Sequence, residues 1–393
     1  MAPNLFFSTA PQRIGLARQR FFDEGIRPTG LVPDAVIQSW MRCVQADRTV
    51  AESISFTPVT RSRIDSAVAR NRLLLDAGHE DLQQLQIVLA GTGCKAILTD
   101  AHCIVVHSTH TSREDGNLMW LAGRVGVDLS EASVGTTAPG MVALSGRSCT
   151  VYGAEHFFDV NNGLQCAAAP IRDVRGELMA VLDLSCEARG FQFDAAALTH
   201  VFATAIENRL LTRQSKPHVL LRFQAGPQLL HTPLEGLAAI DETGHLMWIN
   251  AAGRSLLRAP QSGNDRTHVE QSFGLKLPRL MAAARANTLL QHRLPNGLQL
   301  YVQAQTNLRQ AHAAWPLSKP RAVLAEPAPV AAKPGPLPAA ARRDDGAKLR
   351  EANLHLIATT LAACGGNVSR AARELGVSRG LVYRHLKLAG TTP

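Results

Sequence analysis

Apolar side chains recur at helical spacing in three stretches of the first 215 residues. The stretch at residues 33–46 starts with a proline, which favours the first turn of a helix. The stretches at residues 60–89 and 194–211 have no such marker, but their apolar positions lie three and four residues apart. This spacing places the apolar side chains on one face. The pattern therefore predicts three amphipathic helical regions.

Between these regions the period of the apolar positions shortens to two. Residues 94–100 and 103–108 read as two strands around a short turn, and residues 165–171 and 178–184 read as a second pair joined by the polar turn RDVRGE. Alternation with polar turns is typical of antiparallel hairpins. We therefore expect an α+β multidomain chain whose first domain covers residues 1–215.

A second, smaller α/β unit is predicted over residues 225–310. Residues 236–257 read as strand, Asp-Glu-Thr-Gly turn, strand and helix, and a further strand follows Pro295-Asn296-Gly297. Trp248 and Asn250 lie at the junction between the second strand and the helix. Asn is a favoured N-cap, so we expect Asn250 to cap that helix.

Proline then interrupts the pattern. Seven of the 21 prolines of the chain lie between Pro316 and Pro338. Because proline removes amide donors and favours extended backbone, residues 311–345 are predicted to be a semi-rigid linker without a core of their own.

Helical spacing returns in the last unit, residues 346–393. Residues 348–364 form an amphipathic helix that ends at two glycines, and Asn367 is placed to cap a short helix over residues 368–375. Gly376 breaks that helix, and Ser378 is placed to cap a third helix over residues 379–388. Three short helices with a glycine turn before the last are typical of a helix-turn-helix unit.

Charge gives this unit a candidate partner. The net charge of the chain is +9, and residues 342–393 hold nine Lys or Arg against four Asp or Glu, a net of +5. The outward face of the third helix carries Arg379, Tyr383, Arg384 and Lys387, and arginine forks suit phosphate and guanine. A solvated basic tail, or a three-helix bundle with a charged face, is the alternative to a DNA-binding unit.

The motif GNVSRAARELGVSRGLVYRHLK resembles the Fis-type helix-turn-helix of bacterial enhancer-binding activators. The resemblance implies binding to double-stranded DNA as a homodimer, through a pairing stripe on the first helix formed by Leu349, Leu356, Ile357 and Leu361. It implies DNA contacts from the last helix and its cap, namely Ser378, Arg379, Leu381, Tyr383, Arg384 and Lys387. Leu381 stands where such motifs often have a polar residue, which leaves the base-reading pattern open.

The N-terminal part resembles the acetoin-catabolism type of activator. The segment VDLSEASVGTTAPGMVAL (residues 127–144) and residues 153–158, 165–185 and 205–211 are similar to a GAF sensor domain, and residues 236–257 are similar to a PAS domain. Such activators carry an ATPase module before the helix-turn-helix. This sequence has no GxxxxGK[ST] motif and no Gly-Lys dipeptide, so no P-loop lysine can be placed.

The GAF resemblance implies a ligand pocket between the sheet and the helices that cover it. Small side chains at residues 166–169 leave room for a ligand, although small residues in a strand also permit close helix packing. The candidate ligand-binding residues are Val134, Thr136, Met141, Cys166 and Ala168.

The seven cysteines are scattered, and none form a CxxC pair, which indicates free thiols in a reducing compartment. A cluster near the first hairpin could hold a metal or act in redox chemistry, although a packed hairpin is the better interpretation of Cys94, His102, Cys103, His107 and His110. Residues 156–158 are predicted to be core. We predict no cofactor and no metal site.

The sequence therefore predicts a cytoplasmic transcription regulator without enzymatic or ATPase activity. It has no secretory signal pattern and no apolar run long enough for a membrane span. The small-molecule effector is not identifiable, and RNA polymerase is a further candidate partner. Two alternatives stay open: a GAF-fold thiol-dependent reductase using Cys94, Cys103 or Cys166, and a non-catalytic modulator of a full-length sigma-54 activator.

Overall fold

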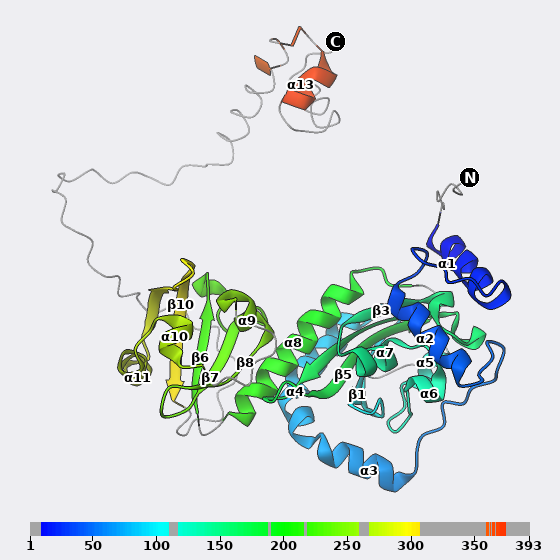
Figure 1. Ribbon diagram of the computed structural model, residues 1–393, viewed down its shortest axis with the longest axis horizontal. Coiled ribbons are helices and arrows are strands. Elements are labelled where there is room, and N and C mark those ends of the chain that lie inside the picture. The colour runs from blue at the N-terminus through cyan, green and yellow to red at the C-terminus, as the bar shows by residue number, and fades with distance from the viewer. Residues whose placement is uncertain are drawn as a thin grey trace. The chain divides into compact units, whose positions relative to one another are not determined.

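The computed structural model describes residues 9–109, 117–187, 190–215, 218–258 and 267–306, and in the last part of the chain 359–360, 362, 364–365 and 367–374. The chain divides into two compact units, Met1–Glu326 and Pro327–Pro393 (Figure 1).

Four helices precede the first sheet. They are α1 (Ala10–Arg18), which continues into a π-helical turn, α2 (Asp34–Gln45), α3 (Arg61–Arg70) and α4 (Arg72–Leu89). The helix predicted at residues 33–46 is confirmed as α2. The long region predicted at residues 60–89 is two helices, because the backbone leaves helical geometry at Asn71. The side-chain Nδ2 of Asn71 donates to the carbonyl of Ala67 at 2.9 Å and closes α3.

The first sheet has five antiparallel strands in the order β2-β1-β5-β4-β3. Its strands are β1 (Cys94–Asp100), β2 (Val105–Ser108), β3 (Cys149–Tyr152), β4 (Leu164–Arg172) and β5 (Leu178–Glu187). Both predicted hairpins are present, and the sheet also contains β3, which the sequence analysis did not identify.

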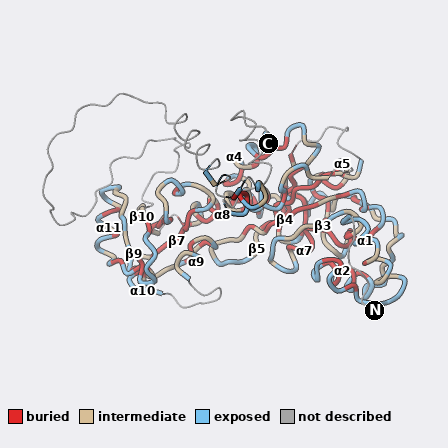
Figure 2. Tube along the Cα trace, turned by 90° about the horizontal axis from the view of Figure 1, so that it is seen from above, coloured by how far each residue is buried: buried red, intermediate tan, exposed pale blue. Residues whose placement is uncertain are grey.

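Helices cover both faces of this sheet. On one face α4 and the long helix α8 (Ala195–Gln214) bury their apolar side chains, including Leu74, Leu85 and Ile206, against the strands. On the other face lie α2 and the short helices α5 (Asn117–Ala122), α6 (Glu131–Val134) and α7 (Ala138–Ser145), with Trp40 and Phe157 in the core. The strands β4 and β5 are therefore buried from both sides, as the red tube of Figure 2 shows.

Connecting segments complete this second face. Two short 3₁₀ turns follow β3, at Gly153–Glu155 and Asp159–Asn161. Trp40 Nε1 donates to the carbonyl of Glu155 at 2.8 Å, and both Phe157 and Phe158 are buried. The core assignment of residues 156–158 is confirmed.

The second sheet is also antiparallel, in the order β8-β7-β6-β10-β9. Its strands are β6 (Val219–Gln224), β7 (Gly236–Ile240), β8 (Leu246–Ile249), β9 (Leu289–Arg293) and β10 (Gln299–Thr306). Three helices accompany it, α9 (Ala251–Leu257), α10 (Val269–Phe273) and α11 (Leu277–Ala286). The central strand of this sheet, β6, starts at Val219. The second domain therefore begins before residue 225, where the sequence predicted its boundary.

The second unit contains α13 (Val368–Glu374). Asn367 Oδ1 accepts from the backbone N–H of Arg370 at 3.1 Å, which confirms the predicted N-cap, and Ala371 and Ala372 are buried. The third helix predicted at residues 379–388 lies outside the described residues. Within the described part of the chain, no helix is long and apolar enough to cross a membrane.

Candidate functional site

The five candidate ligand-binding residues lie on one face of the first sheet, in its interior. Cys166 and Ala168 come from β4, Met141 from α7 and Val134 from the end of α6, and these four share one core. Thr136 follows in the loop between α6 and α7 and is fully buried. The structure therefore places all five candidates in the interior between this face of the sheet and the helices that cover it.

A polar contact fixes the loop that carries Thr136. The hydroxyls of Thr136 and Ser39 share a hydrogen bond of 2.7 Å, and Ser39 also donates to the carboxylate of Glu131. Arg42 donates to both oxygens of Glu131, at 2.6 and 2.7 Å. Charge-assisted bidentate pairs are among the strong hydrogen bonds. The Arg42–Glu131 pair therefore connects α2 to α6 next to the loop that carries Thr136.

Gly135 is needed in the same loop. Its φ of +69° is left-handed, and a Cβ there would come within 2.8 Å of the Phe158 ring. The next helix is capped by Thr137, whose Oγ1 accepts from the backbone N–H of Gly140 at 3.2 Å. The VGTTAPG segment is thus a tight turn between two helices, with only small side chains over the sheet.

A buried chain of polar groups crosses the floor of this site. Ser185 Oγ donates to Asp183 Oδ2 at 2.5 Å and lies 3.1 Å from Cys166 Sγ. Cys166 Sγ lies 3.5 Å from His156 Nε2, and His156 Nδ1 lies 2.8 Å from the carbonyl of Gly153. A carbonyl only accepts, so Nδ1 carries the proton of the neutral ring and Nε2 accepts from the Cys166 thiol.

Burial controls the charge of these groups. It raises the pKa of Asp183 to about 7, against the hydrogen bond from Ser185, which lowers it. It lowers the pKa of His156 to about 4 and raises the pKa of Cys166 well above its ordinary value. Charged forms are disfavoured away from water. Near neutral pH, therefore, His156 and Cys166 are neutral and Asp183 is close to its titration midpoint.

Two buried polar atoms that the strands carry on this face have no hydrogen-bond partner within the described residues. They are Asp183 Oδ1 and Thr99 Oγ1, and both side chains are at most 1% exposed. Thr99 lies on β1 two residues from Ile97, the residue paired with Asp183, so both side chains belong to the same face. Buried polar atoms normally have partners. These two atoms could hydrogen-bond a small polar molecule.

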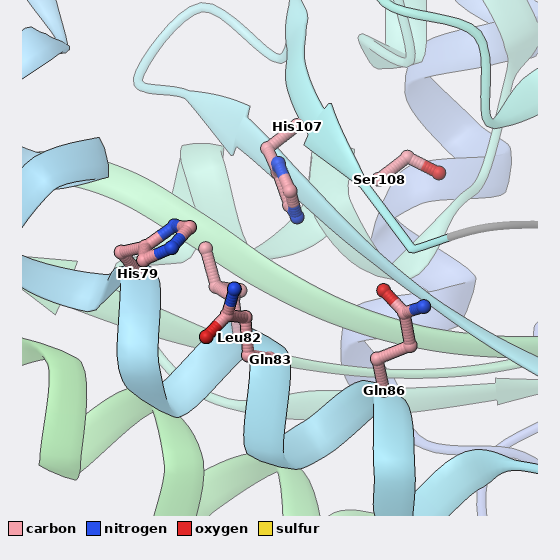
Figure 3. Close-up of a pocket in the computed structure, with 6 residues that line it drawn as sticks. All are labelled: His79, Leu82, Gln83, Gln86, His107 and Ser108. Atoms are coloured by element: carbon pink, nitrogen blue, oxygen red, sulfur yellow. The ribbon is translucent and has the colours of Figure 1, made fainter.

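A separate surface cavity of about 220 Å³ lies between α4 and the edge strand β2. Figure 3 shows His79, Gln83 and Gln86 along the helix, with His107 and Ser108 opposite them. Burial, and then the nearby His79, lowers the pKa of His107. Most of the lining side chains can hydrogen-bond, and the cavity lies on the side of the sheet away from the five candidates.

The cluster of Cys and His side chains near the first hairpin does not converge. His107 points into the surface cavity, whereas Cys103 belongs to the opposite core, and His110 lies outside the described residues. Within the described residues, no group of three potential metal ligands is present. Burial raises the pKa of Cys103 to about 12, so this thiol is a poor nucleophile.

The long helix α8 connects the two sheets through side-chain contacts. Trp248 Nε1 donates to Ser215 Oγ at 2.7 Å, and Asn250 Nδ2 donates to Asn208 Oδ1 at 2.9 Å. Asn250 Oδ1 accepts from the backbone N–H of Gly253 at 2.8 Å, so the predicted cap of α9 is confirmed. Sequence analysis found Asn250 by its capping position but missed its bond to α8, for which there was no local signal.

The predicted DNA-contacting residues (Ser378, Arg379, Leu381, Tyr383, Arg384 and Lys387) and the predicted pairing stripe (Leu349, Leu356, Ile357 and Leu361) lie outside the described residues. The helix α13, which comes directly before the predicted recognition helix, is described, and its buried Ala371 and Ala372 leave room for a close helix crossing.

Comparison with known families assigns both parts of the chain. Residues 9–209 match the MimR N-terminal domain, and residues 348–387 match the Fis family of bacterial regulatory proteins. The predicted resemblance to acetoin-type regulators with a Fis-type helix-turn-helix is therefore confirmed.

Similar proteins extend this finding. The acetoin catabolism regulatory protein of Cupriavidus necator is 31% identical over 245 residues, which is 58% of this chain and 35% of that protein. The propane 2-monooxygenase operon transcriptional activator MimR of Mycolicibacterium smegmatis is 27% identical over 210 residues, 52% of this chain and 34% of that one. The chain thus spans about a third of the length of these relatives.

Among solved structures, the chain is similar to the E. coli DhaR(N)–DhaL complex, at 17% identity and a TM-score of 0.44, with 69% of this chain and 99% of that chain covered. The match to the MimR N-terminal domain extends over half of the sequence. The chain therefore belongs to the family of proteins that carry the MimR N-terminal domain.

Proposed function

We propose that this chain is a DNA-binding transcription regulator whose N-terminal region receives a chemical signal. The observation that carries the proposal is the presence, on one chain, of a MimR N-terminal domain at residues 9–209 and a Fis-type region at residues 348–387. The relatives named as operon regulators and activators support the same output.

Double-stranded DNA is the proposed partner of the C-terminal unit. The N-cap at Asn367 and the buried Ala371 and Ala372 support a compact helix pair that presents the next helix. Arg379 and Arg384 on that next helix would contact phosphate or guanine, since the planar guanidinium makes two parallel hydrogen bonds. Ser378, Leu381, Tyr383 and Lys387 complete the proposed contact surface.

We propose that the DNA-bound form is a homodimer paired through Leu349, Leu356, Ile357 and Leu361. The proline-rich stretch at residues 316–338 is expected to transmit a rigid rotation poorly. A signal in the N-terminal region would then act by bringing two C-terminal units together, which raises their effective concentration at a two-fold operator.

The proposed effector site is the interior face formed by Val134, Thr136, Met141, Cys166 and Ala168. The unpartnered Asp183 Oδ1 and Thr99 Oγ1 on the same face favour a small molecule with polar groups. The contacts of α8 with both sheets offer a route from this face to the second sheet. The GAF-like and PAS-like assignments of the two domains are part of this proposal.

We propose no enzymatic step for this chain. Burial and the raised pKa values of Cys103 and Cys166 disfavour these two thiols as the nucleophile of a thiol-dependent reductase, because the thiolate is the reactive form. The sequence holds no P-loop lysine, so the proposed regulation does not use ATP hydrolysis by this chain. RNA polymerase is a proposed second partner, and the cytoplasm is the proposed location.

Selection from sheared bacterial genomic DNA tests the proposal. The full chain and a chain that ends at residue 341 are each used to capture fragments, which are then sequenced. The full chain should enrich a small set of fragments that share one sequence, and the shortened chain should enrich none. Equal enrichment by both proteins would contradict DNA binding by the Fis-type region.

A further inference from the structure

Two cysteines face each other on neighbouring inner strands of the first sheet, β1 and β5. In the antiparallel pairing of β1 with β5, Cys94 stands directly opposite Cys186. Directly opposed residues in such strands have Cα atoms about 4.5–5.5 Å apart. A disulfide joins Cα atoms about 4.4–6.8 Å apart. The backbone thus already holds the two residues at a separation that a disulfide can span.

The two thiols differ in access. Cys94 is partly exposed at the start of β1, whereas Cys186 is 2% exposed. The backbone N–H of Cys94 donates to Thr92 Oγ1 at 3.2 Å, and this contact fixes the turn that leads from α4 into the strand. A reagent from solvent would therefore reach the Cys94 sulfur before the Cys186 sulfur.

Local contacts also make Cys94 different from the other thiols. A hydrogen bond with Cys186 lowers the pKa of Cys94 to about 7, against the effect of burial, and Thr92 adds to the lowering. The same contact raises the pKa of Cys186. All seven cysteines lie within the described residues, and each of the other five has a raised pKa: Cys43, Cys103, Cys149, Cys166 and Cys364. Only Cys94 is therefore substantially thiolate near neutral pH.

We propose that Cys94 and Cys186 form a redox-modification site for hydroperoxides, with Cys94 as the attacking thiolate and Cys186 as the resolving thiol. The Cys94 sulfur attacks one oxygen of the hydroperoxide, the O–O bond breaks, hydroxide or alkoxide leaves, and Cys94 becomes a sulfenic acid. The Cys186 thiol then attacks that sulfur, the disulfide forms and water leaves. The two thiols lose two electrons, and these reduce the hydroperoxide.

The disulfide would lock two central strands of the sheet. In the strand order, β1 and β5 are neighbours, and β5 also carries Asp183 and Ser185 of the buried polar chain. The site thus couples oxidation to the strand that forms the floor of the interior face. It does not depend on the proposed effector or on DNA binding.

Peroxide treatment of the full, reduced chain tests this site. After hydrogen peroxide, peptide mass mapping should find a linked Cys94–Cys186 peptide that disappears on reduction. In Cys186→Ser, the serine hydroxyl can still donate a hydrogen bond to the Cys94 sulfur. The trapping reagent dimedone should therefore label Cys94 as a sulfenic acid at least about tenfold faster than Cys149 in the same protein, because thiolate reacts and thiol does not. Cys149→Ser is the matched control and should still form the linked peptide.

Two results would overturn the proposal. One is equal labelling of Cys94 and Cys149 in Cys186→Ser. The other is a native chain in which Cys94 is oxidised to sulfinic acid while no linked peptide forms. If Cys186→Ser does not fold, iodoacetamide alkylation of the native chain between pH 5 and 9 decides instead. Cys94 should then be alkylated first, and alkylation of Cys149 at the same rate would contradict the site.

Discussion

Replacing Asp183 by Asn tests the charge state of the carboxyl group on the interior face of the first sheet. Asp183 is 1% exposed, and burial raises the pKa of its carboxyl to about 7. In the unfolded chain an aspartate titrates near pH 3.9. Between these values the folded protein binds a proton that the unfolded chain has lost. The free energy of unfolding therefore falls as the pH rises from about 4 to about 7.

The size of the effect follows from the two pKa values. Between pH 5 and pH 8, Asp183 should cost the native chain about 2.5 kcal/mol of stability, to within about 1 kcal/mol. Asn has almost the same shape and no proton to lose. Its amide can keep the bond to Ser185, and its other polar atom is placed where Asp183 Oδ1 already has no partner within the described residues. Any fixed cost of the substitution is the same at both pH values and cancels in the difference.

Urea unfolding at pH 5 and pH 8, followed by circular dichroism and tryptophan fluorescence, measures this difference. The free energy of unfolding of Asp183→Asn relative to the native chain should rise by about 2.5 kcal/mol from pH 5 to pH 8. Asp76→Asn, at an exposed position on α4, is the matched control and should follow the native chain at both pH values. Equal pH dependence of Asp183→Asn and the native chain would refute the buried, protonated carboxyl.

Three further substitutions test the contacts around the interior face and the contact between α8 and the second sheet. Burial lowers the pKa of His156 to about 4, so its contribution to the free energy of unfolding is present above about pH 6.5 and is lost as the pH falls. Between pH 6.5 and pH 5, urea unfolding of His156→Asn should therefore show a loss of stability about 1.5 kcal/mol smaller than that of the native chain. Asn250→Ala removes the cap of α9 and the hydrogen bond to α8, and thermal unfolding should show a loss of stability of about 1–3 kcal/mol. An unchanged unfolding temperature would contradict a stabilising contact between α8 and the second sheet. Gly135→Ala places a Cβ 2.8 Å from the Phe158 ring at a φ of +69° and should cost about 1–3 kcal/mol in the same assay, whereas Gly163→Ala, with nothing within 4 Å of its Cβ, should cost less than about 1 kcal/mol.

Local signals in the sequence were sufficient for several elements. The strand at residues 94–100 and its hairpin partner were predicted from the period of the apolar positions, which shortens to two on both sides of a short turn. The N-caps at Asn250 and Asn367 were predicted from residue type and position. These features depend on a few neighbouring residues. The same holds for the Fis-type motif, whose spacing is fixed within about 20 residues.

The elements that were missed depend on distant partners. The strand β6 has buried residues at nearly every position, so it shows no alternation that marks a strand, and only its pairing with β7 and β10 defines it. In the same way, Cys94 meets Cys186, and Cys166 meets Ser185 and His156, only after the sheet has formed. No spacing along the chain encodes these contacts.

The affinity of the full chain for its selected DNA fragment tests the central claim most directly. Fluorescence anisotropy at two salt concentrations should give binding that weakens steeply with salt, because neutralised phosphates release counterions. Arg384→Ala should weaken binding by about 1–3 kcal/mol if it reads a base, and Arg61→Ala, whose side chain is 87% exposed on α3, should bind like the native chain. Affinity that is unchanged in Arg379→Ala and Arg384→Ala and insensitive to salt would contradict a DNA-binding C-terminal helix.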